Sequence, residues 1–208
     1  MSSRRDTRRA VRLRRAIAGD RVLVVVAGPN GAGKTTFVER FLEPLGMRIV
    51  NPDAIARVLL PESPEEAAYE AARAADAIRA DLIDRGLSFC METVFSDEKG
   101  SKVEFLRHAR EQDYAVILIF IGLESSTLSA SRVMQRTEAG GHDVPDEKIV
   151  SRFPRVFANL AKALEFVDHA FLFDNSSADD PYRFVAEMRG GRIVKRGAAR
   201  PRWWTPSK

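Results

Sequence analysis

The sequence has little of what a disulfide framework, a zinc site or a membrane anchor would require. It contains one cysteine, Cys90, so no disulfide can form within the chain, and such cysteine usage is typical of a reducing compartment. Its three histidines do not occur at metal-ligand spacing, which argues against zinc. No apolar run approaches the roughly 20 residues that span a bilayer. We therefore expect a cytoplasmic protein whose 208 residues form one hydrophobic core.

Acidic residues are scarce at both ends of the chain. Residues 1–21 carry a net charge of +6 and residues 189–208 carry +7, whereas the stretch between them sums to −9. Basic ends of this kind bind nucleic acid, a membrane surface or an acidic partner, or they fold against the acidic body of the same chain. The last interpretation is favoured because the middle lacks the basic stripe of a nucleic-acid-binding domain. No apolar segment follows the Arg-rich start, so we expect neither a secretory leader nor membrane association.

One strong motif is present. Residues 28–35 read Gly-Pro-Asn-Gly-Ala-Gly-Lys-Thr, between an apolar run at 21–27 and a helix-like segment that starts at Thr35. Backbone N–H groups of such a loop turn toward a polyphosphate, while Lys34 reaches the β- and γ-phosphates and the Thr35 hydroxyl binds Mg²⁺. We predict that the chain binds ATP or GTP. The predicted nucleotide contacts here are Gly28, Asn30, Gly31, Ala32, Gly33, Lys34, Thr35 and Thr36.

Strand-like and helix-like segments alternate along the chain. Apolar runs typical of parallel strands buried on both faces occur at 21–27, 47–51, 87–93, 114–121 and 169–174. Helical patterns occur at 63–86, 98–112, 125–138, 146–166 and 178–189. This alternation predicts an α/β fold, a three-layer sandwich around a parallel sheet, with ligands beyond the carboxyl ends of the strands. We expect the domain at 21–190, a basic arm or helix at 1–20 and a basic tail at 191–208.

Polar residues at the ends of the second and third predicted strands are candidate substrate contacts. Asp53 follows Asn51-Pro52, where it either caps a helix or accepts the proton of a substrate hydroxyl and orients it toward the γ-phosphate. Glu92 closes an apolar strand, so its carboxylate must be paired or functional. We expect it to bind a substrate hydroxyl or to hold Mg²⁺ through water, with an ion pair to Lys34 or another local cation as the alternative. Weaker candidates for hydroxyl contacts follow at Thr93 and Ser96.

Cations concentrate between residues 125 and 155, on both sides of a turn that contains Gly140-Gly141. Two helices joined by such a turn suggest a lid, and lid arginines stabilise the charge on a transferring phosphoryl group. Closure of a lid also excludes bulk water. The alternative is a set of ordinary surface arginines. The candidates are Arg132 at the nucleotide, Arg136 and Arg152 as catalytic groups, and Lys148 and Arg155.

Two further segments carry weaker signals. Asp174-Asn175-Ser176 ends the fifth predicted strand beside the phosphate loop, and Asn175 is predicted to contact the nucleobase, with a local turn as the alternative. Near the C-terminus, cations surround Trp203 and Trp204. Such tryptophans can stack on bases, but we expect them to cover an exposed edge of the core.

Together these segments resemble the zeta-toxin-like P-loop kinases, in particular their short stand-alone branch of predicted ATPases. The resemblance covers about residues 21–185 and rests on 27–36, Asn51-Pro52-Asp53, Glu92-Thr93, 140–145 with Arg152-Phe153, and Asp174-Asn175-Ser176.

The family resemblance implies strand order 2-3-1-4-5 and phosphoryl transfer from ATP to a nucleotide-sugar hydroxyl, as on UDP-N-acetylglucosamine. It implies Lys34 as the phosphate lysine, Asp53 as the base, Glu92 as a substrate contact and lid arginines among 132, 136, 152 and 155. It also implies a small antitoxin protein that blocks the ATP site.

The sequence thus predicts an ATP- and Mg²⁺-dependent phosphotransferase that acts on a hydroxyl of a small molecule, as the toxin of a toxin–antitoxin pair would. Two alternatives stay open. The basic ends and the tryptophans suggest a nucleic-acid end kinase, and the phosphate loop alone is also compatible with a nucleotide-dependent binding ATPase.

Overall fold

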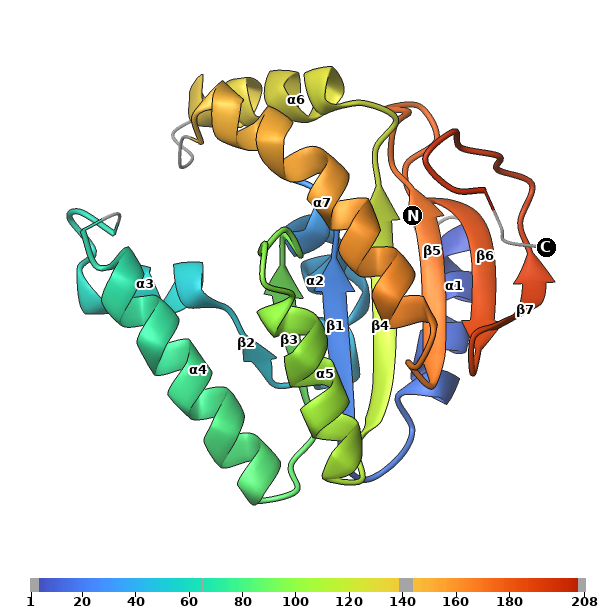
Figure 1. Cartoon of the computed structure of the whole chain (residues 1–208), viewed down its shortest axis with the longest axis horizontal. Helices are drawn as coiled ribbons and strands as arrows, with labels where there is room; N and C mark the ends of the chain where they lie inside the picture. Colours follow the sequence, from blue (N-terminus) through green and yellow to red (C-terminus); the bar gives the residue numbers. More distant parts are fainter. Residues whose placement is uncertain (1–3, 65, 139–143, 206–208) are drawn as a thin grey trace.

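A computed structural model describes residues 4–64, 66–138 and 144–205. Its centre is a seven-stranded sheet in the order β2-β3-β1-β4-β5-β6-β7 (Figure 1). The first five strands in the chain are parallel and have the order 2-3-1-4-5, so the predicted fold class and strand order are confirmed. The strands are β1 Val22–Ala27, β2 Ile49–Val50, β3 Phe89–Thr93, β4 Ala115–Gly122, β5 His169–Asp174, β6 Arg183–Arg189 and β7 Arg192–Arg196.

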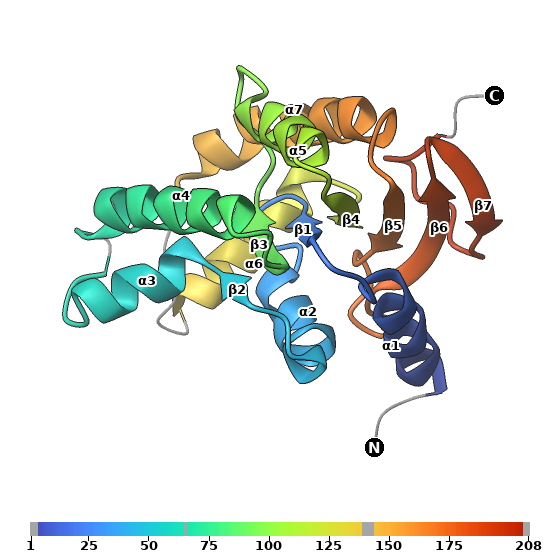
Figure 2. The same ribbon diagram turned by 90° about the horizontal axis from the view of Figure 1, so that it is seen from below.

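Helices cover both faces of the sheet (Figure 2). One face packs against α4, α5 and α7, and the other packs against α1 and α2. Figure 1 shows α3 and α4 at the β2 end of the sheet and α6 above the strand ends. The helices are α1 Arg4–Ala16, α2 Lys34–Phe41, α3 Pro52–Leu59, α4 Ala68–Asp84, α5 Ser101–Glu111, α6 Ser126–Glu138 and α7 Asp146–Leu164, with a short 3₁₀ turn at Glu43–Leu45.

Strand β1 shows why the sheet forms as it does. All six of its residues are apolar and buried. Successive side chains of a strand point to opposite faces, so Leu23, Val25 and Ala27 join the core under α5 and α7. The alternate residues Val22, Val24 and Val26 join the core under α1 and α2. Neighbouring β3 contributes Cys90, which is buried as expected.

The predicted helix at 178–189 is wrong, because this segment contains β6. Strand β6 pairs antiparallel with β5, and β7 pairs antiparallel with β6. Gly190 and Gly191 form the hairpin turn with φ of 50° and 74°, values that residues with a Cβ avoid. The predicted border between domain and basic tail, at 190/191, therefore lies inside a hairpin of the sheet.

Both basic ends fold at least in part against the body. Asp6 of α1 forms ion pairs with Arg9, at 2.7 Å, and with Arg40 of α2, at 2.6 Å. Arg9 also donates to the backbone oxygen of Tyr182 at 2.7 Å.

None of the helices in the described ranges is long and apolar enough to cross a membrane.

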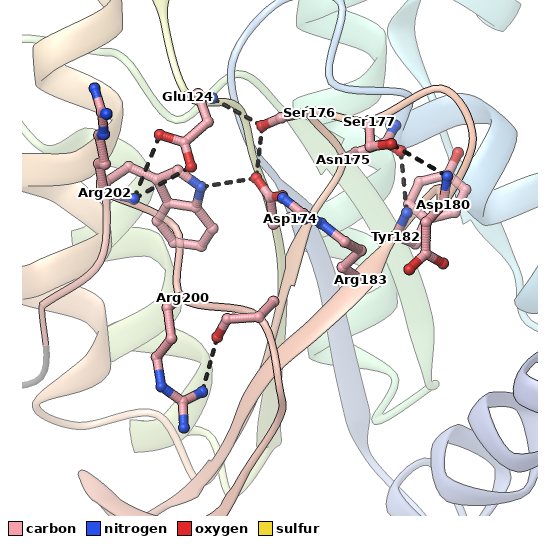
Figure 3. A network of polar contacts seen from close by, with 12 residues as sticks. Glu124, Asp174, Asn175, Ser176, Ser177, Asp180, Tyr182, Arg183, Arg200 and Arg202 are labelled. Atoms are coloured by element: carbon pink, nitrogen blue, oxygen red, sulfur yellow. Dashed lines mark hydrogen bonds and ion pairs between the residues drawn. The ribbon is translucent and has the colours of Figure 1, made fainter.

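The C-terminal segment covers an edge of the core, as expected for its tryptophans. Trp203 packs against Phe120 and Phe157, with ring centroids 5.5 and 5.7 Å apart. Its indole N–H donates to the carboxylate of Asp174 at 3.1 Å, within the network drawn in Figure 3. A Cβ at Gly122 would lie 2.3 Å from the indole, so only glycine leaves room for this contact.

Replacing the indole tests this packing. Trp203→Ala should lower the free energy of unfolding by about 3 kcal/mol, because it leaves a cavity beside Phe120 and removes a hydrogen bond to the buried Asp174. Urea denaturation followed by circular dichroism measures the change. The control is Arg202→Ala, which truncates an exposed side chain next in sequence and should change stability by less than about 0.5 kcal/mol. Equal stability of the two variants would contradict a stabilising contact between Trp203 and the core.

Candidate active site

The phosphate loop runs from the end of β1 to the start of α2. Gly28 has φ of 151°, and a Cβ there would lie 2.1 Å from the backbone oxygen of Ile121. Gly33 has φ of 83° and directly precedes α2, and a Cβ there would lie 2.9 Å from side-chain atoms of Asn175 and Tyr182. The glycines thus allow a tight loop that leads into a helix N-terminus, where partial positive charge favours a phosphate.

Side chains from outside the loop bind its backbone oxygens. Ser129 of α6 donates to the oxygen of Asn30 at 2.6 Å. Asn175 donates to the oxygen of Ala32 at 2.8 Å, and the Tyr182 hydroxyl donates to the oxygen of Gly33 at 2.9 Å. Carbonyl groups held toward the protein orient the loop for N–H groups to meet an anion on its other side. Sequence reasoning missed Ser129 and Tyr182, which carry no motif of their own.

Two predicted nucleotide contacts take part in this support. The side-chain oxygen of Asn175 accepts from the N–H of Tyr182 at 3.1 Å, so both ends of its amide bind the protein. Arg132 is half-buried and donates to the backbone oxygen of Asn175 at 2.7 Å. Both residues therefore fix the geometry of the loop, and a direct contact of either with the nucleotide stays a prediction.

Lys34 lies inside the loop that it is predicted to serve. Its ammonium group donates to the backbone oxygens of Gly28 and Pro29 at 2.9 and 2.8 Å. Burial lowers the pKa of Lys34 to about 8, and the positive charge of Arg136 acts in the same direction. The negative charges of Glu92 and Asp53 oppose that shift. The four predicted groups therefore lie close enough to interact electrostatically around the phosphate site.

A chain of hydrogen bonds joins the phosphate loop to β2 and α3. The Thr35 hydroxyl donates to one carboxylate oxygen of Glu92 at 2.9 Å, and the Asn51 amide donates to the other at 3.1 Å. The Asn51 side-chain oxygen accepts from the N–H of Asp53 at 2.9 Å. Strand register explains the arrangement. Glu92 lies opposite Val26 near the end of β1, and Val50 of β2 lies opposite Met91, so Asn51 comes next to Glu92. Asn51 is a site residue that sequence reasoning missed.

The surroundings of Glu92 differ from the alternative of a direct ion pair with Lys34. The pKa of the Glu92 carboxyl group is raised, mainly because the group is buried, and the negative charge of Asp53 adds to this shift. The hydrogen bond from Thr35 and the positive charge of Lys34 act in the opposite direction. Its hydrogen-bond partners are Thr35 and Asn51 rather than Lys34. This carboxylate therefore lies at the phosphate loop, and its predicted contact with a substrate hydroxyl stays a prediction.

Asp53 is exposed in the first turn of α3. Asn51, not Asp53, caps this helix, since its side chain accepts the first free N–H. The capping alternative for Asp53 is therefore wrong. An exposed carboxylate beside Glu92 and Lys34 is free to meet a substrate hydroxyl from the solvent side.

The predicted lid consists of α6 and the first half of α7, and the turn at 139–143 lies outside the described residues. Arg136 is exposed on α6, and Arg152 is half-buried on α7. Arg155 forms an ion pair with Glu98. Deeper in α7, Asn159 donates to the backbone oxygens of Phe95 and Asp97 at 3.1 and 3.0 Å. The second half of α7 is thus bound to the loop after β3.

The hydroxyl candidates of that loop have different surroundings. The Thr93 hydroxyl accepts from the N–H of Phe95 at 3.0 Å, where the backbone has a positive φ of 64°. Thr93 therefore shapes the loop. Ser96 is half-buried two residues before the exposed Glu98. A substrate contact of either hydroxyl stays a prediction.

The residues present fit a magnesium ion bound together with a nucleotide. Mg²⁺ prefers oxygen ligands and keeps several waters, so it needs only one or two protein groups beside phosphate oxygens. Thr35 and Glu92 supply a hydroxyl and a carboxylate oxygen 2.9 Å apart at the phosphate loop. Within the described ranges, no three His, Cys, Asp or Glu side chains form a metal site of their own.

Comparison with known proteins identifies a family for this chain. Residues 23–160 match the model of the protein family AAA_33, described as an AAA domain. The chain belongs to this family. An uncharacterized protein of Haemophilus influenzae, strain Rd, is 26% identical over 130 residues, which are 62% of this chain and 91% of that protein.

Solved structures show the same fold at low sequence identity. AvrRxo1-ORF1:AvrRxo1-ORF2 with sulphate ions has a TM-score of 0.66 and 20% identity, over 93% of this chain and 67% of that chain. The PezAT toxin–antitoxin system of Streptococcus pneumoniae has a TM-score of 0.57 and 16% identity, over 90% and 82%. The resemblance to the zeta-toxin-like P-loop kinases is thereby confirmed for the fold.

The low pKa of Lys34 predicts how nucleotide binding depends on pH. Phosphates stabilise the charged lysine and raise its pKa in the complex, so binding near pH 8 must take up a proton. Below pH 7 the free lysine is already charged and affinity should not change through this group. Above pH 8 the Kd for ATP should rise up to about tenfold per pH unit. Titration calorimetry in two buffers of different ionisation enthalpy measures the proton uptake.

The control is Lys34→Arg, whose guanidinium keeps its charge throughout this range. This variant should lose the pH dependence even if its affinity is lower. A Kd for the unchanged protein that is flat from pH 7 to pH 9, without proton uptake, would contradict a lysine pKa near 8.

Removing the amide of Asn51 tests the link between Glu92 and α3. Asn51→Ala should reduce turnover about tenfold or more while the Kd for ATP changes little, because the phosphate loop keeps its other supports. Asn51→Asp, which still caps α3, should place a second carboxylate beside Glu92 and raise the pH at which activity appears. An Asn51→Ala variant with unchanged kcat would show that the link is structural only.

Proposed function

We propose that this protein transfers the γ-phosphoryl group of ATP to a hydroxyl group of a small molecule. One observation carries the proposal: hydrogen bonds connect Thr35 of the phosphate loop through Glu92 and Asn51 to Asp53. They hold the backbone of Asp53 near the phosphate loop, which supports a role for its exposed carboxylate beside the terminal phosphate of ATP. A protein that only bound nucleotide would have no need of the Asp53 carboxylate, which follows β2 and lies outside the phosphate loop.

The roles follow from position and charge. Lys34 and the loop hold the phosphates of ATP. Asp53 orients the acceptor hydroxyl and takes its proton as the new O–P bond forms and the bond to ADP breaks. Arg136, whose charge acts on Lys34, and Arg152 stabilise negative charge on the transferring group. When bound, magnesium supplies charge neutralisation between the phosphates, and Thr35 and Glu92 would hold it.

The acceptor that we propose is a nucleotide sugar of the UDP-N-acetylglucosamine type. Support comes from the fold likeness to the PezAT toxin–antitoxin system and from the zeta-toxin-like motifs of the sequence. The same likeness, together with that to the two-component AvrRxo1-ORF1:AvrRxo1-ORF2 complex, supports a small antitoxin protein as a partner. Cysteine usage and a fold of this kind support action in the cytoplasm.

A nucleic-acid end kinase is the second candidate. The fold is similar to part of the Pnkp1/Rnl/Hen1 RNA repair complex, with a TM-score of 0.53 and 17% identity over 69% of this chain and 46% of that chain. The basic ends of the chain also favour it. Identifying the phosphorylated product decides between the two candidates.

Asp53→Asn tests the proposed base. We expect ATP affinity within about threefold of the unchanged protein and a loss of transfer of about 10²- to 10⁴-fold, the usual contribution of a general base. The assay supplies γ-labelled ATP with UDP-sugars, nucleosides and oligonucleotides, and mass spectrometry identifies the product. The matched control is Asp84→Asn, an exposed aspartate at the end of α4, which should leave transfer unchanged.

Each result has a distinct meaning. Phosphorylated oligonucleotide as the sole product would replace the proposed acceptor with the second candidate. Full transfer by Asp53→Asn would remove Asp53 from catalysis. ATP binding without transfer to any acceptor, in both the unchanged protein and the variant, would favour a binding ATPase.

A further inference from the structure

A second cavity lies away from the phosphate loop. It encloses about 490 Å³ between α1 and the strands β5 and β6, a volume typical of sites for small molecules or single chemical groups. Its walls combine aromatic rings with three guanidinium groups and one carboxylate, and they include Arg9, Arg12, Phe173, Asp180, Arg183 and Phe184. Neither the proposed phosphoryl transfer nor the resemblance to kinases uses this cavity.

The two basic ends of the chain meet at this cavity. Arg9 and Arg12 reach it from α1, and Ala198 and Ala199 reach it from the segment that follows β7. Figure 2 shows α1 at the same end of the sheet as β6 and β7. The guanidinium of Arg9 lies 5.4 Å from the ring centre of Phe173, and that of Arg12 lies 4.9 Å from that of Phe184. Segments far apart in sequence thereby lie side by side at this cavity.

Only part of this charge is neutralised within the protein. Arg9 pairs with Asp6, and Arg183 pairs with Asp174. Other cations on α1 and β7 are exposed or half-exposed, and they form no ion pair with any residue of the described ranges. These cations are Arg12, Arg14, Arg15, Arg192, Lys195 and Arg196. A surface with this much unbalanced positive charge attracts polyanions.

We propose that this surface binds single-stranded nucleic acid, with phosphates on the cations of α1 and β7 and one base in the cavity. Five of the six unpaired cations are arginines, whose planar fork matches a phosphate group in bidentate geometry. Aromatic and guanidinium walls suit a planar base, since bases stack on both types of group. An acidic peptide without aromatic residues would satisfy the charges but offers no planar ring for the cavity.

The proposed surface is separate from the proposed catalytic site. It lies at the β6–β7 end of the sheet, whereas Asp53 follows β2 at the opposite end. Nucleic acid bound there is a ligand and not the phosphoryl acceptor at Asp53. The inference therefore does not rest on the proposed function.

The test measures binding of a fluorescent single-stranded oligonucleotide of about 16 nucleotides. The oligonucleotide has no terminal phosphate, which removes the group that the phosphate loop would bind. We expect affinity to fall steeply with salt concentration, with a slope of about −0.7 per phosphate contact. Arg12→Gln with Arg196→Gln should weaken binding at least tenfold at low salt and reduce the magnitude of the slope by about 1.4, which corresponds to two contacts.

The matched control is Arg73→Gln with Arg85→Gln, which removes the same charge from α4 and from the residue that follows this helix. Both of these residues are exposed, and the control should bind the oligonucleotide as the unchanged protein does. Because Arg12 lies on Phe184, thermal melting checks that the first pair keeps its fold, and Arg196→Gln alone serves as a second, fully exposed variant. Lys34→Ala should retain oligonucleotide binding, which separates this surface from the phosphate loop.

Three outcomes would overturn the proposal. The first is equal weakening by both pairs of substitutions, which would mean that net charge alone attracts the oligonucleotide. The second is equal affinity for a glutamate-rich peptide of the same charge, which would assign the surface to acidic protein segments. The third is loss of oligonucleotide binding in Lys34→Ala, which would place the ligand at the phosphate loop.

Discussion

The hydrogen bond between the Thr35 hydroxyl and the Glu92 carboxylate is the contact on which the site depends. A carboxylate at the end of a buried strand is costly unless it is bonded, and here both of its oxygens have partners. One oxygen fixes the start of α2 and the other fixes Asn51 before α3. The phosphate loop and the exposed Asp53 are therefore held in one frame through a single side chain.

Support from outside the loop is equally important for its shape. Residues on α6 and between β5 and β6 bind its backbone oxygens, so contacts with the rest of the protein stabilise the conformation of the loop. Such preorganisation lowers the cost of binding a polyphosphate because little has to become ordered. Burial also lowers the pKa of Lys34, and a bound phosphate would stabilise the charged form of this lysine.

The sequence predicts much of the fold because its strong signals are local. The glycine loop and the apolar runs that become β1, β3, β4 and β5 specify a parallel sheet without information on distant contacts. Asp53 and Glu92 are predictable as site candidates because polar residues at strand ends meet at one edge of such a sheet. Asn51 carries the same signal, and its amide connects the two acids.

Where prediction failed, distant contacts decide the structure. The segment at 178–189 has a helical pattern, but Gly190-Gly191 is a hairpin signal, and pairing with β5 makes β6 a strand. Tyr182 could not be recognised either, because its role depends on Gly33, which lies 149 residues earlier in the chain. The sequence predicts the lid arginines only as a group, because their individual partners depend on how α6 and α7 pack.

Tyr182 gives the start of the chain an influence on the nucleotide site. Its backbone oxygen accepts from Arg9 of α1, and its hydroxyl donates to the oxygen of Gly33. The first helix is therefore a structural brace of the phosphate loop and not a dispensable extension. Homologues that lack this helix would need another element to steady the same tyrosine, and an affinity tag fused close to Arg4 would sit beside the brace.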